Sequence, residues 1–517
     1  MNNRDLQATW AYHNATKHSH ASVRSSTHFL DWANQPLPFK IYPQLQALPL
    51  PREVPQTGVA TLAAIAEAGG GRQSAATLDV RTLSLLLYFS AGITRQRKYP
   101  GGELYFRAAA CTGALYEIEL YPVVRGLPEL EAGVYHFGPA DFALRPLRAG
   151  DWRGELVDAT GSEPAVARAP LILVCTGTYW RNAWKYQART YRHFGWDNGT
   201  LLANLLAMAA ALGLPARVVS GFVDARVNAL VGADPEREVA FSLVAIGREE
   251  EPPPQAPASI PVLTYEALPV SRREVDYPAM REVHTASSFI TSAEVAAWRG
   301  HLTTREPAAS SGPLIRLRPL SDEAVPRDPI ERVILRRGST RRFARAPITL
   351  EQLSTMLDRA TREIPADFLE PGGELLNELY LTVHAVEGLL PGAYHFRRET
   401  LELELLREGD FREKAYFLGL EQELPGDASV AIFFLADLER ILERFGNRGY
   451  RATQLEAGIL GGKLYLAAYA LRLGATGLTF YDDDVVRFFS PHAQGKSAIF
   501  LVAIGQRPKR EEIAASE

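Results

Sequence analysis

Residues 336–344 read RRGSTRRFA and place four arginines around one serine. Within this stretch Arg337, Ser339 and Arg341 follow the spacing R-x-S-x-R. Guanidinium groups and a hydroxyl suit a dianionic phosphate, because arginine donates paired, charge-assisted hydrogen bonds. Arginines at a helix end are also often no more than a solvated surface. The cluster therefore predicts a phosphate site, and a solvated helix end is the alternative.

Other common catalytic and metal-binding patterns are missing from the sequence. The two cysteines, Cys111 and Cys175, form no C-x-x-C pair, so we expect neither a disulfide framework nor a structural zinc site. The 11 histidines are scattered and include no H-E-x-x-H motif, so we expect no metal. Cys111 has no histidine in its motif, and we expect it to be a small loop residue rather than a nucleophile.

The chain contains the same sequence pattern twice. Tyr135 in GVYHF and Tyr394 in GAYHF lie 259 residues apart. The segments IELYPVV and NELYLTV, and the long segments that begin at Thr190 and Gly449, keep this offset. A constant offset over so many segments indicates one duplicated domain rather than a short-period repeat.

Each copy combines helices and strands. Short runs rich in β-branched residues, such as LILVCTG and FSLVAIG, predict strands, and VYHF followed by FALRPL predicts a hairpin. A long helix is predicted after Thr190, because apolar residues share one of its faces: Leu201, Leu205, Met208 and Leu212. Thr349 and Gln352 form a T-x-x-Q capping box, which predicts a helix start just after the arginine cluster. The fold class is therefore α+β.

Polar and proline-rich segments suggest the domain boundaries. We expect an N-terminal arm over residues 1–55 and the first copy over 56–249. The stretch EEEPPPQAPASIP opens a linker and wrapping segment over 250–325, and the second copy follows over 326–510.

Charge and hydropathy limit the possible partners. The formal net charge of −4 argues against a nucleic-acid binder, which needs a basic face. No apolar run reaches the roughly 18 residues of a membrane span. The N-terminus has no apolar core of a signal peptide. We therefore expect a cytoplasmic protein without nucleic-acid or membrane partners.

The order of these motifs resembles a known family. R-x-S-x-R and a capped helix, then GALYEIELY, YHF…LRAGD, YR…DNG and a closing LVAIG, are similar to the nitroreductase superfamily. Within it, the chain most resembles the SagB/ThcOx-type dehydrogenases, which oxidise azoline rings in peptide natural products. YHNATKHS near the N-terminus resembles the start of that subfamily. The resemblance implies FMN bound at the interface of an intimate dimer, formed here by the two copies as a pseudo-dimer. Further association between chains is left open.

The resemblance favours one FMN site, built from both copies. In the second copy, Arg337, Ser339 and Arg341 would bind the FMN phosphate, and Thr479 would lie in the loop beside flavin N5. The first copy would cover the ring with its loop ACTGA, in which the family usually has P-S-x-G-A. The loop residues concerned are Cys111, Thr112, Gly113 and Ala114.

An opposite site would use the equivalent residues of the other copy, namely Arg72, Ser74, Ser220 and Gly221. Here Ala76 stands in place of the second arginine, and the covering loop around Gly372 and Gly373 is altered. The loop with Ser220 and Gly221 is nevertheless better preserved than the one with Thr479. One FMN and two FMN per chain therefore both stay open, with the first site favoured.

Lys185 and Tyr186 match a Lys-Tyr pair that is taken as catalytic in azoline dehydrogenases. The second copy has Arg444 and Phe445 at this place. A tyrosine hydroxyl or a lysine amine can take a proton while hydride leaves for the flavin. The alternative is a surface lysine beside a packed tyrosine.

The resemblance implies an FMN-dependent oxidoreductase that acts on a small organic or peptide-derived substrate. The first alternative is an NAD(P)H-dependent reductase of nitro compounds or quinones. The second is a degenerate protein that binds flavin without catalysis or serves as a scaffold, because motifs in both copies have changed.

Overall fold

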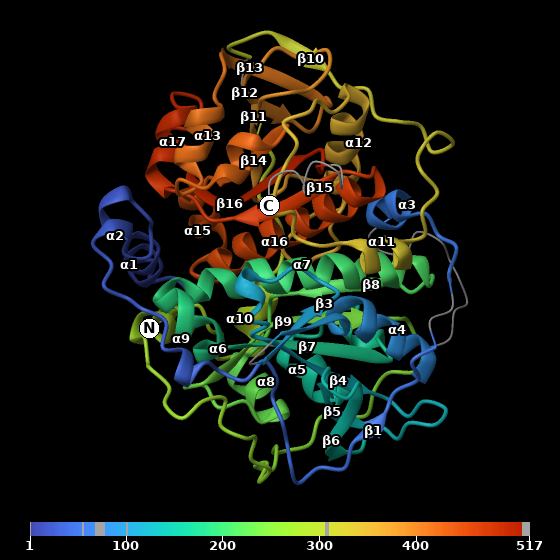
Figure 1. The fold of residues 1–517 in the computed structure, drawn as a ribbon. Coiled ribbons are helices and arrows are strands. Elements are labelled where there is room, and N and C mark those ends of the chain that lie inside the picture. Colours follow the sequence, from blue (N-terminus) through green and yellow to red (C-terminus); the bar gives the residue numbers. More distant parts are fainter. Residues whose placement is uncertain (1, 54–55, 68–77, 100–101, 306–309, 509–517) are drawn as a thin grey trace.

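The computed structural model describes residues 2–53, 56–67, 78–99, 102–305 and 310–508. Figure 1 shows two α+β halves, the first copy below and the second above, each built around a seven-stranded sheet. Neighbouring strands run antiparallel in both sheets, and the strand order is the same. The duplication and the α+β fold class are therefore confirmed.

The first sheet has the order β1 (Leu48–Pro49), β6 (Ala143–Ala149), β5 (Gly133–Gly138), β4 (Ile118–Val124), β7 (Leu171–Thr178), β9 (Glu238–Ile246) and β8 (Ala216–Val219). Its helices are α3 (Thr61–Ala66), α4 (Val80–Ala91), α5 (Arg153–Ala159), α6 (Tyr179–Tyr186), α7 (Thr190–Ala211) and α8 (Asp224–Val231). The strands and the hairpin expected from the apolar runs are confirmed.

The second sheet has the order β10 (Leu314–Arg316), β13 (Glu402–Glu408), β12 (Gly392–Arg397), β11 (Glu378–Val383), β14 (Val430–Ala436), β16 (Ser497–Gly505) and β15 (Gly474–Leu478). Its helices are α11 (Ile330–Arg336), α12 (Leu350–Thr361), α13 (Arg412–Leu418), α14 (Glu423–Asp427), α15 (Leu438–Phe445), α16 (Arg448–Ala470) and α17 (Asp482–Phe489). The capping box of Thr349 and Gln352 is present at the start of α12.

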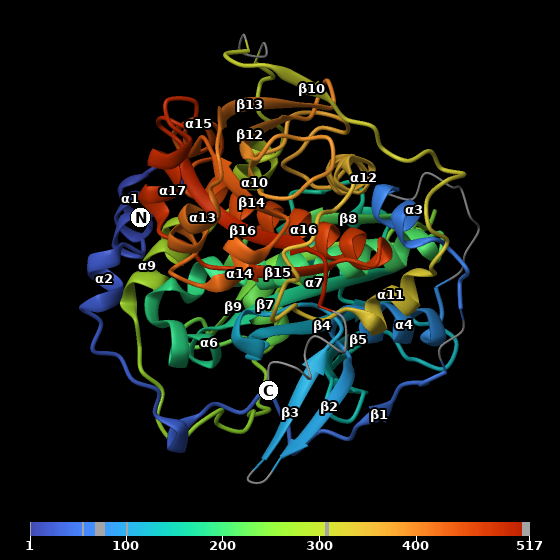
Figure 2. The same cartoon turned by 45° about the horizontal axis from the view of Figure 1, so that its top comes forward.

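Several elements lie outside this repeat. A hairpin of β2 (Ile93–Tyr99) and β3 (Gly102–Arg107) belongs to the first copy alone and projects from the body in Figure 2. The N-terminal helices α1 (Gln7–Ala15) and α2 (His20–Arg24) lie beside the second copy (Figure 1). Between the copies run α9 (Pro278–Ala286) and α10 (Ser292–Trp298). The edge strands β1 and β10 come from segments 1–55 and 250–325, so each segment also adds to a sheet.

The two copies meet along their central helices, α7 and α16, which lie side by side between the sheets (Figures 1 and 2). A Cβ atom added to Gly199 would lie 2.5 Å from Cα of Gly458, and one added to Gly458 would lie 2.5 Å from the carbonyl oxygen of Trp196. Gly199 and Gly458 are equivalent residues of the two copies. The pseudo-twofold axis therefore passes through a backbone contact that tolerates no side chain on either helix.

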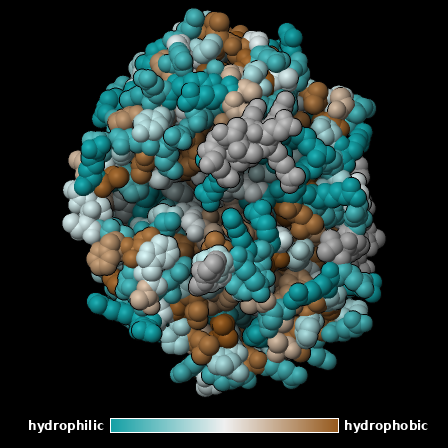
Figure 3. Space-filling view, viewed as in Figure 1, coloured by the Kyte–Doolittle hydropathy of each residue, from teal (hydrophilic) through white to brown (hydrophobic). Residues whose placement is uncertain are grey.

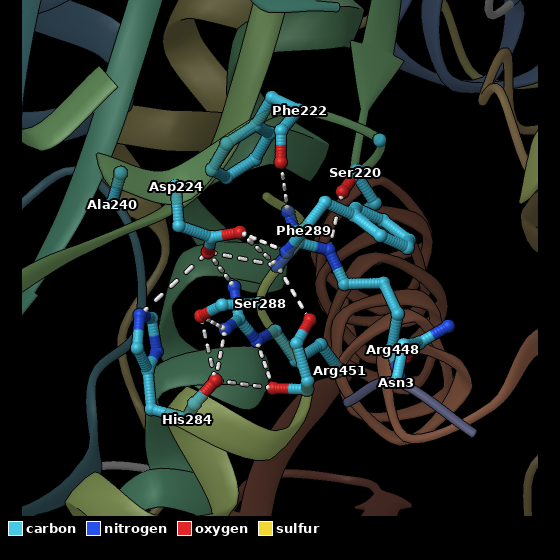
Figure 4. Close-up of polar contacts among 12 residues, drawn as sticks. Asn3, Ser220, Phe222, Asp224, Ala240, His284, Ser288, Phe289, Arg448 and Arg451 are labelled. Atoms are coloured by element: carbon cyan, nitrogen blue, oxygen red, sulfur yellow. Dashed lines mark hydrogen bonds and ion pairs between the residues drawn. The ribbon is translucent and has the colours of Figure 1, made fainter. Parts of the chain in front are cut away.

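Reciprocal ion clusters hold the ends of this helix pair. Arg448 and Arg451 of α16 each place Nη1 within 2.8 Å of Oδ1 of Asp224, the first residue of α8 in the other copy (Figure 4). All three side chains are buried. Burial opposes ionisation of Asp224, but the two arginine charges outweigh it and hold its pKa well below the usual value.

The same cluster is repeated with the copies exchanged. Arg189 and Arg192, near the start of α7, contact Asp482 of α17 at 3.1 and 2.7 Å. Burial again opposes ionisation, and the arginine charges lower the pKa of Asp482 to about 2. The buried charges thus pair across the interface in both directions, as expected for an intrachain pseudo-dimer.

The surface seen in Figure 3 mixes hydrophilic and hydrophobic side chains, with the hydrophobic ones scattered in small groups. In the described part of the chain, no helix is both long and apolar enough to cross a membrane.

Replacing Gly199 by alanine should destabilise the whole chain, because the added methyl group would overlap the backbone of α16. Overpacking at such a contact costs about 1–3 kcal/mol. Gly126→Ala is the matched control, since a Cβ there meets nothing closer than 3.9 Å. Thermal unfolding should show a clearly lower Tm for Gly199→Ala than for Gly126→Ala. Equal Tm values would mean that the helix contact is not as close as described.

Candidate functional site

Arg337 joins the two copies at the predicted phosphate site. Helix α11 ends at Arg336, and Arg337 is its C-cap residue. The Arg337 side chain crosses to the first copy, where Nε donates to the carbonyl oxygen of Ala108 at 2.9 Å and Nη2 donates to that of Arg107 at 3.1 Å. These carbonyls directly precede the loop predicted to cover the flavin ring. The arginine motif of one copy and the loop of the other therefore lie together.

Positive charge gathers here without a carboxylate. Neither Arg337 nor Arg341 forms an ion pair with any residue that the structure describes. Burial lowers the pKa of Arg337, and the charge of Arg95 from the hairpin β2–β3 lowers it further. A buried guanidinium that bonds only neutral carbonyls is costly unless an anion joins it. Arg337 is partly buried without a described counter-ion, whereas Arg341 is exposed to solvent.

Ser339 and Thr479 lie in the same half of the site. The Ser339 hydroxyl lies 3.3 Å from the hydroxyl of Tyr465, which also accepts a hydrogen bond from Gly477 N at 2.5 Å. Thr479 Oγ1 is buried and finds no partner among the described residues. A buried hydroxyl in this position is available to a polar group of a ligand.

The loop of the first copy is fixed by a buried carboxylate. Asp197 Oδ1 accepts hydrogen bonds from Thr112 N at 2.8 Å and from Thr112 Oγ1 at 2.9 Å. Next in the loop, Gly113 and Ala114 have φ values of 64° and 55°, so a tight left-handed turn brings the backbone to the surface of the site.

Cys111 lies under this loop, with Sγ 3.5 Å from Asp197 Oδ2 and from Glu117 Oε2. Burial, with the charges of Asp197 and Glu117, raises the pKa of the Cys111 thiol well above its usual value. The thiol therefore stays protonated at neutral pH. This fits a loop residue rather than a nucleophile.

Tyr186 reaches the covering loop. A Cβ atom on Gly113 would lie 2.8 Å from the Tyr186 hydroxyl, so only glycine leaves room for it. Lys185 Nζ lies 5.4 Å from the centre of the Tyr186 ring. Burial and the Asp197 charge raise the pKa of Tyr186, while the charge of Arg341 acts to lower it. Residues from both copies thus surround one region: the Lys-Tyr pair and the loop from the first, and the arginines from the second.

At the opposite pseudo-site, described residues of the second copy bond to the loop of Ser220 and Gly221. Arg72 and Ser74 lie outside the described residues. The backbone N–H groups of Ser220 and Gly221 both donate to Asp367, each at 2.8 Å. Trp298 is buried against Gly221, where an added Cβ would lie 3.1 Å from its ring. Arg448 Nε donates to the carbonyl oxygen of Ser220 at 2.7 Å, as Figure 4 shows.

Backbone pairing closes this second pseudo-site further. Val218 N donates to the carbonyl oxygen of Pro365 at 2.8 Å, and Asp367 N donates to that of Val218 at 3.1 Å. At the equivalent place in the second copy, Gly477 N instead bonds Tyr465 of its own copy. One pseudo-site is therefore joined across the copies by strand-like pairing and a carboxylate, whereas the described residues form no such pairing at the Arg337 site.

The Nitroreductase family model matches residues 133–248 and 334–505, which together make up more than half of the chain. The chain belongs to the nitroreductase family. The two matched segments fall in the two copies, so the expected superfamily and its tandem arrangement are confirmed. The family is one of oxidoreductases.

Known proteins resemble this nitroreductase-family chain over part or all of its length. A protein of Methanocaldococcus jannaschii named as a nitroreductase is 26% identical over 165 residues, which cover 30% of this chain and 81% of that protein. A crystal structure from Anabaena variabilis, described as that of a nitroreductase, covers 97% of this chain and 99% of its own, with 27% identity and a TM-score of 0.76. That structure shares both halves and their arrangement.

Two further relatives of this nitroreductase-family chain are processing proteins. The trifolitoxin-processing protein TfxB of Rhizobium leguminosarum bv. trifolii is 30% identical over 34% of this chain and 48% of its own length. The microcin B17-processing protein McbC of Escherichia coli is 30% identical over 32% of this chain and 61% of its own length. Each match spans less than two thirds of the relative. Their similarity agrees with the resemblance to SagB/ThcOx-type proteins.

Sequence reasoning missed several residues that shape the two pseudo-sites of this nitroreductase-family chain. Asp197 belongs to the D-N-G motif, but the sequence did not predict its hydrogen bonds to Thr112. Arg95 lies in a hairpin without an equivalent in the second copy, so the repeat gave no signal for it. Asp367 and Trp298 contact the loop of the second pseudo-site. They lie in segments whose sequence is ordinary for loops and linkers, so no motif marked them.

The Asp367 carboxylate should make stability depend on pH. Burial raises its pKa to about 6, although the N–H groups of Ser220 and Gly221 act to lower it. An unfolded aspartate titrates near a pKa of about 3.9. As the pH falls from about 6 to about 4, the folded state binds the proton first, so the free energy of unfolding should rise by up to about 1.4 kcal/mol per pH unit.

Urea unfolding at pH 4.5 and 7.5 would measure this effect as the difference between wild type and Asp367→Asn. The variant should lack the part of the pH dependence that comes from residue 367. Identical pH profiles of the two proteins would contradict the raised pKa.

Proposed function

We propose that the chain is an FMN-dependent oxidoreductase that binds one FMN between its two copies and oxidises a small organic or peptide-derived substrate. The observation that carries this proposal is the asymmetry of the two pseudo-sites. In one, Arg337 and Arg341 form no ion pair with a described residue and Arg337 contacts the segment before the covering loop, whereas at the other Asp367 and backbone pairing join the two copies.

The charge of the residues at the first site supports the binding of FMN. Arg337 uses Nε and Nη2 on carbonyl oxygens, so Nη1 stays free for a phosphate. Arg341 and Ser339 would complete the phosphate contacts, and the unpaired hydroxyl of Thr479 would bond the ring. The turn at Gly113 would let the backbone approach the ring closely.

FMN, when bound, would supply a hydride acceptor. The chain's own contribution is the handling of the proton. The Tyr186 hydroxyl is protonated at neutral pH, and burial raises its pKa further, so it can donate a hydrogen bond to a substrate or relay a proton toward solvent. Lys185 Nζ lies 5.4 Å from the centre of the same ring, where it can donate a hydrogen bond to an acceptor group of the substrate. The likeness to two peptide-toxin processing proteins supports a peptide-derived substrate.

Purified protein should release one FMN per chain on denaturation. Arg337→Ala and Arg341→Ala each remove a charge-assisted contact of about 1.5–3 kcal/mol. The affinity for FMN should therefore fall roughly ten- to a hundredfold, as measured by fluorescence titration of the apoprotein.

Arg345→Ala is the matched control for these variants, because Arg345 lies on the same loop but pairs with Asp427 at 2.6 Å. It should bind FMN like the wild type, and so should Arg72→Ala. Loss of flavin from Arg72→Ala alone would move the cofactor to the opposite pseudo-site. A colourless protein that takes up no added FMN would favour the scaffold alternative.

Tyr186→Phe should slow substrate oxidation by roughly 10²–10⁴-fold, the usual contribution of a general acid or base, without loss of FMN. The probe is a synthetic thiazoline peptide, mixed anaerobically with flavin-loaded protein while flavin absorbance and thiazole formation are followed. Tyr179→Phe is the control, since its hydroxyl lies on the same helix and has no described partner.

Equal rates for Tyr186→Phe and wild type would remove Tyr186 from catalysis. Rapid bleaching of the flavin by NADPH, with no reaction of the peptide, would favour the nitro- or quinone-reductase alternative.

A further inference from the structure

Three metal-ligating side chains gather in the second copy, apart from the residues assigned to FMN. They are His395 on β12, Glu404 on β13 and His492 in the loop between α17 and β16. One ligand atom from each lies within 4.8 Å of the others. His395 and Glu404 are directly opposite each other in the sheet, and His492 Nε2 lies 4.0 Å from Glu404 Oε2.

Both histidine rings are oriented by a second partner. The hydroxyl of Tyr380 lies 2.8 Å from His492 Nδ1, and Glu378 Oε2 lies 3.1 Å from His395 Nε2. His395 Nδ1 is buried and has no partner among the described residues. Protein zinc sites commonly hold each ligating histidine in this way, through a hydrogen bond at the nitrogen that does not bind the metal.

The carboxylate of Glu404 is fixed as well. Its Oε1 accepts hydrogen bonds from Ser311 N at 2.6 Å and from Ser311 Oγ at 2.9 Å. Its Oε2 faces His492 and has one long contact, 3.5 Å, with Arg397 Nη1. The side chain is only 2% exposed. Oε2 is therefore the oxygen that can bind a cation.

The first copy provides an internal comparison. His136 and Glu119 repeat the pair of His395 and Glu378, with Nε2 and Oε2 2.9 Å apart, and His136 Nδ1 is also unpaired. Opposite His136, however, stands Arg145 where the second copy has Glu404, and Asp234 takes the place of His492, because the copies are offset by 258 residues in this part of the chain. The second copy alone has added a carboxylate and a histidine beside the shared pair.

We propose that His395, Glu404 and His492 bind one Zn²⁺ ion, with a water as the fourth ligand. Zinc prefers tetrahedral sites of histidine and carboxylate with bonds of about 2 Å, which place ligand atoms roughly 3.4 Å apart. Closing the gap between His492 and Glu404 would need a shift of only about 0.6 Å on this estimate. The metal would fasten the loop that carries His492 to β12 and β13.

Zn²⁺ binding to the full chain tests this proposal. The protein, freed of any affinity tag and treated with a chelator, is titrated with Zn²⁺ in a calorimeter. We expect one Zn²⁺ per chain. His492→Ala and Glu404→Gln should each weaken binding at least tenfold, since loss even of an outer-shell partner typically costs roughly 10–100-fold in affinity. Zinc should also raise the Tm of the wild type but not of these variants.

His301→Ala is the matched control, because His301 forms an exposed pair with Glu370 at 3.5 Å and belongs to no group of three possible metal ligands among the described residues. It should bind Zn²⁺ like the wild type. Glu404→Gln keeps the shape of the side chain, so it reports on the metal even if His492→Ala folds poorly. The visible spectrum of bound Co²⁺ gives a second readout, with intense bands for four ligands. No Zn²⁺ binding by the wild type, or equal affinity in Glu404→Gln, would overturn the proposal.

Discussion

The backbone contact between α7 and α16 at Gly199 and Gly458 is the constraint on which the rest of the structure depends. Since neither glycine has a side chain, the two helices approach until their own backbones touch. This distance carries the arginines at the start of each helix into the other copy, where Asp224 and Asp482 neutralise them. Buried arginines without these carboxylates would be very costly. The helix contact and the ion clusters are therefore two separate interactions that favour the same arrangement of the two copies.

The same pseudo-twofold axis creates two interface sites, and both are suited to negative charge or hydrogen-bond acceptors. At one, the chain supplies its own acceptor, because the Asp367 carboxylate takes the N–H groups of Ser220 and Gly221. At the other, Arg337 and Arg341 have no carboxylate among the described residues. On the proposed function, the first of these sites is stabilised by its own carboxylate, and the second binds the phosphate of FMN.

Much of the fold could be predicted because its signals are local or repeated. The offset of 259 residues revealed the duplication, and apolar runs with the capping box at Thr349 located strands and helices. The predicted loop and arginine motif were assigned to different copies, and Arg337 contacts that loop's segment. The partners missed by sequence reasoning, such as Asp367 and Arg95, act through contacts between distant segments. Their residue types are ordinary for loops and hairpins, so their roles can be recognised only once the packing of the two copies is known.

Fusion of the copies explains why this asymmetry is possible. In a homodimer every substitution occurs at both symmetric sites, so a carboxylate that fills one site would fill both. In a fused chain, Asp367 can close one site while Ala366 pairs its backbone with β8, and the other site is unaffected. The closed site then contributes buried hydrogen bonds and the packing of Trp298 to the interface. On the proposed function, the duplicated chain has exchanged one of two cofactor sites for additional contacts between its copies around the other.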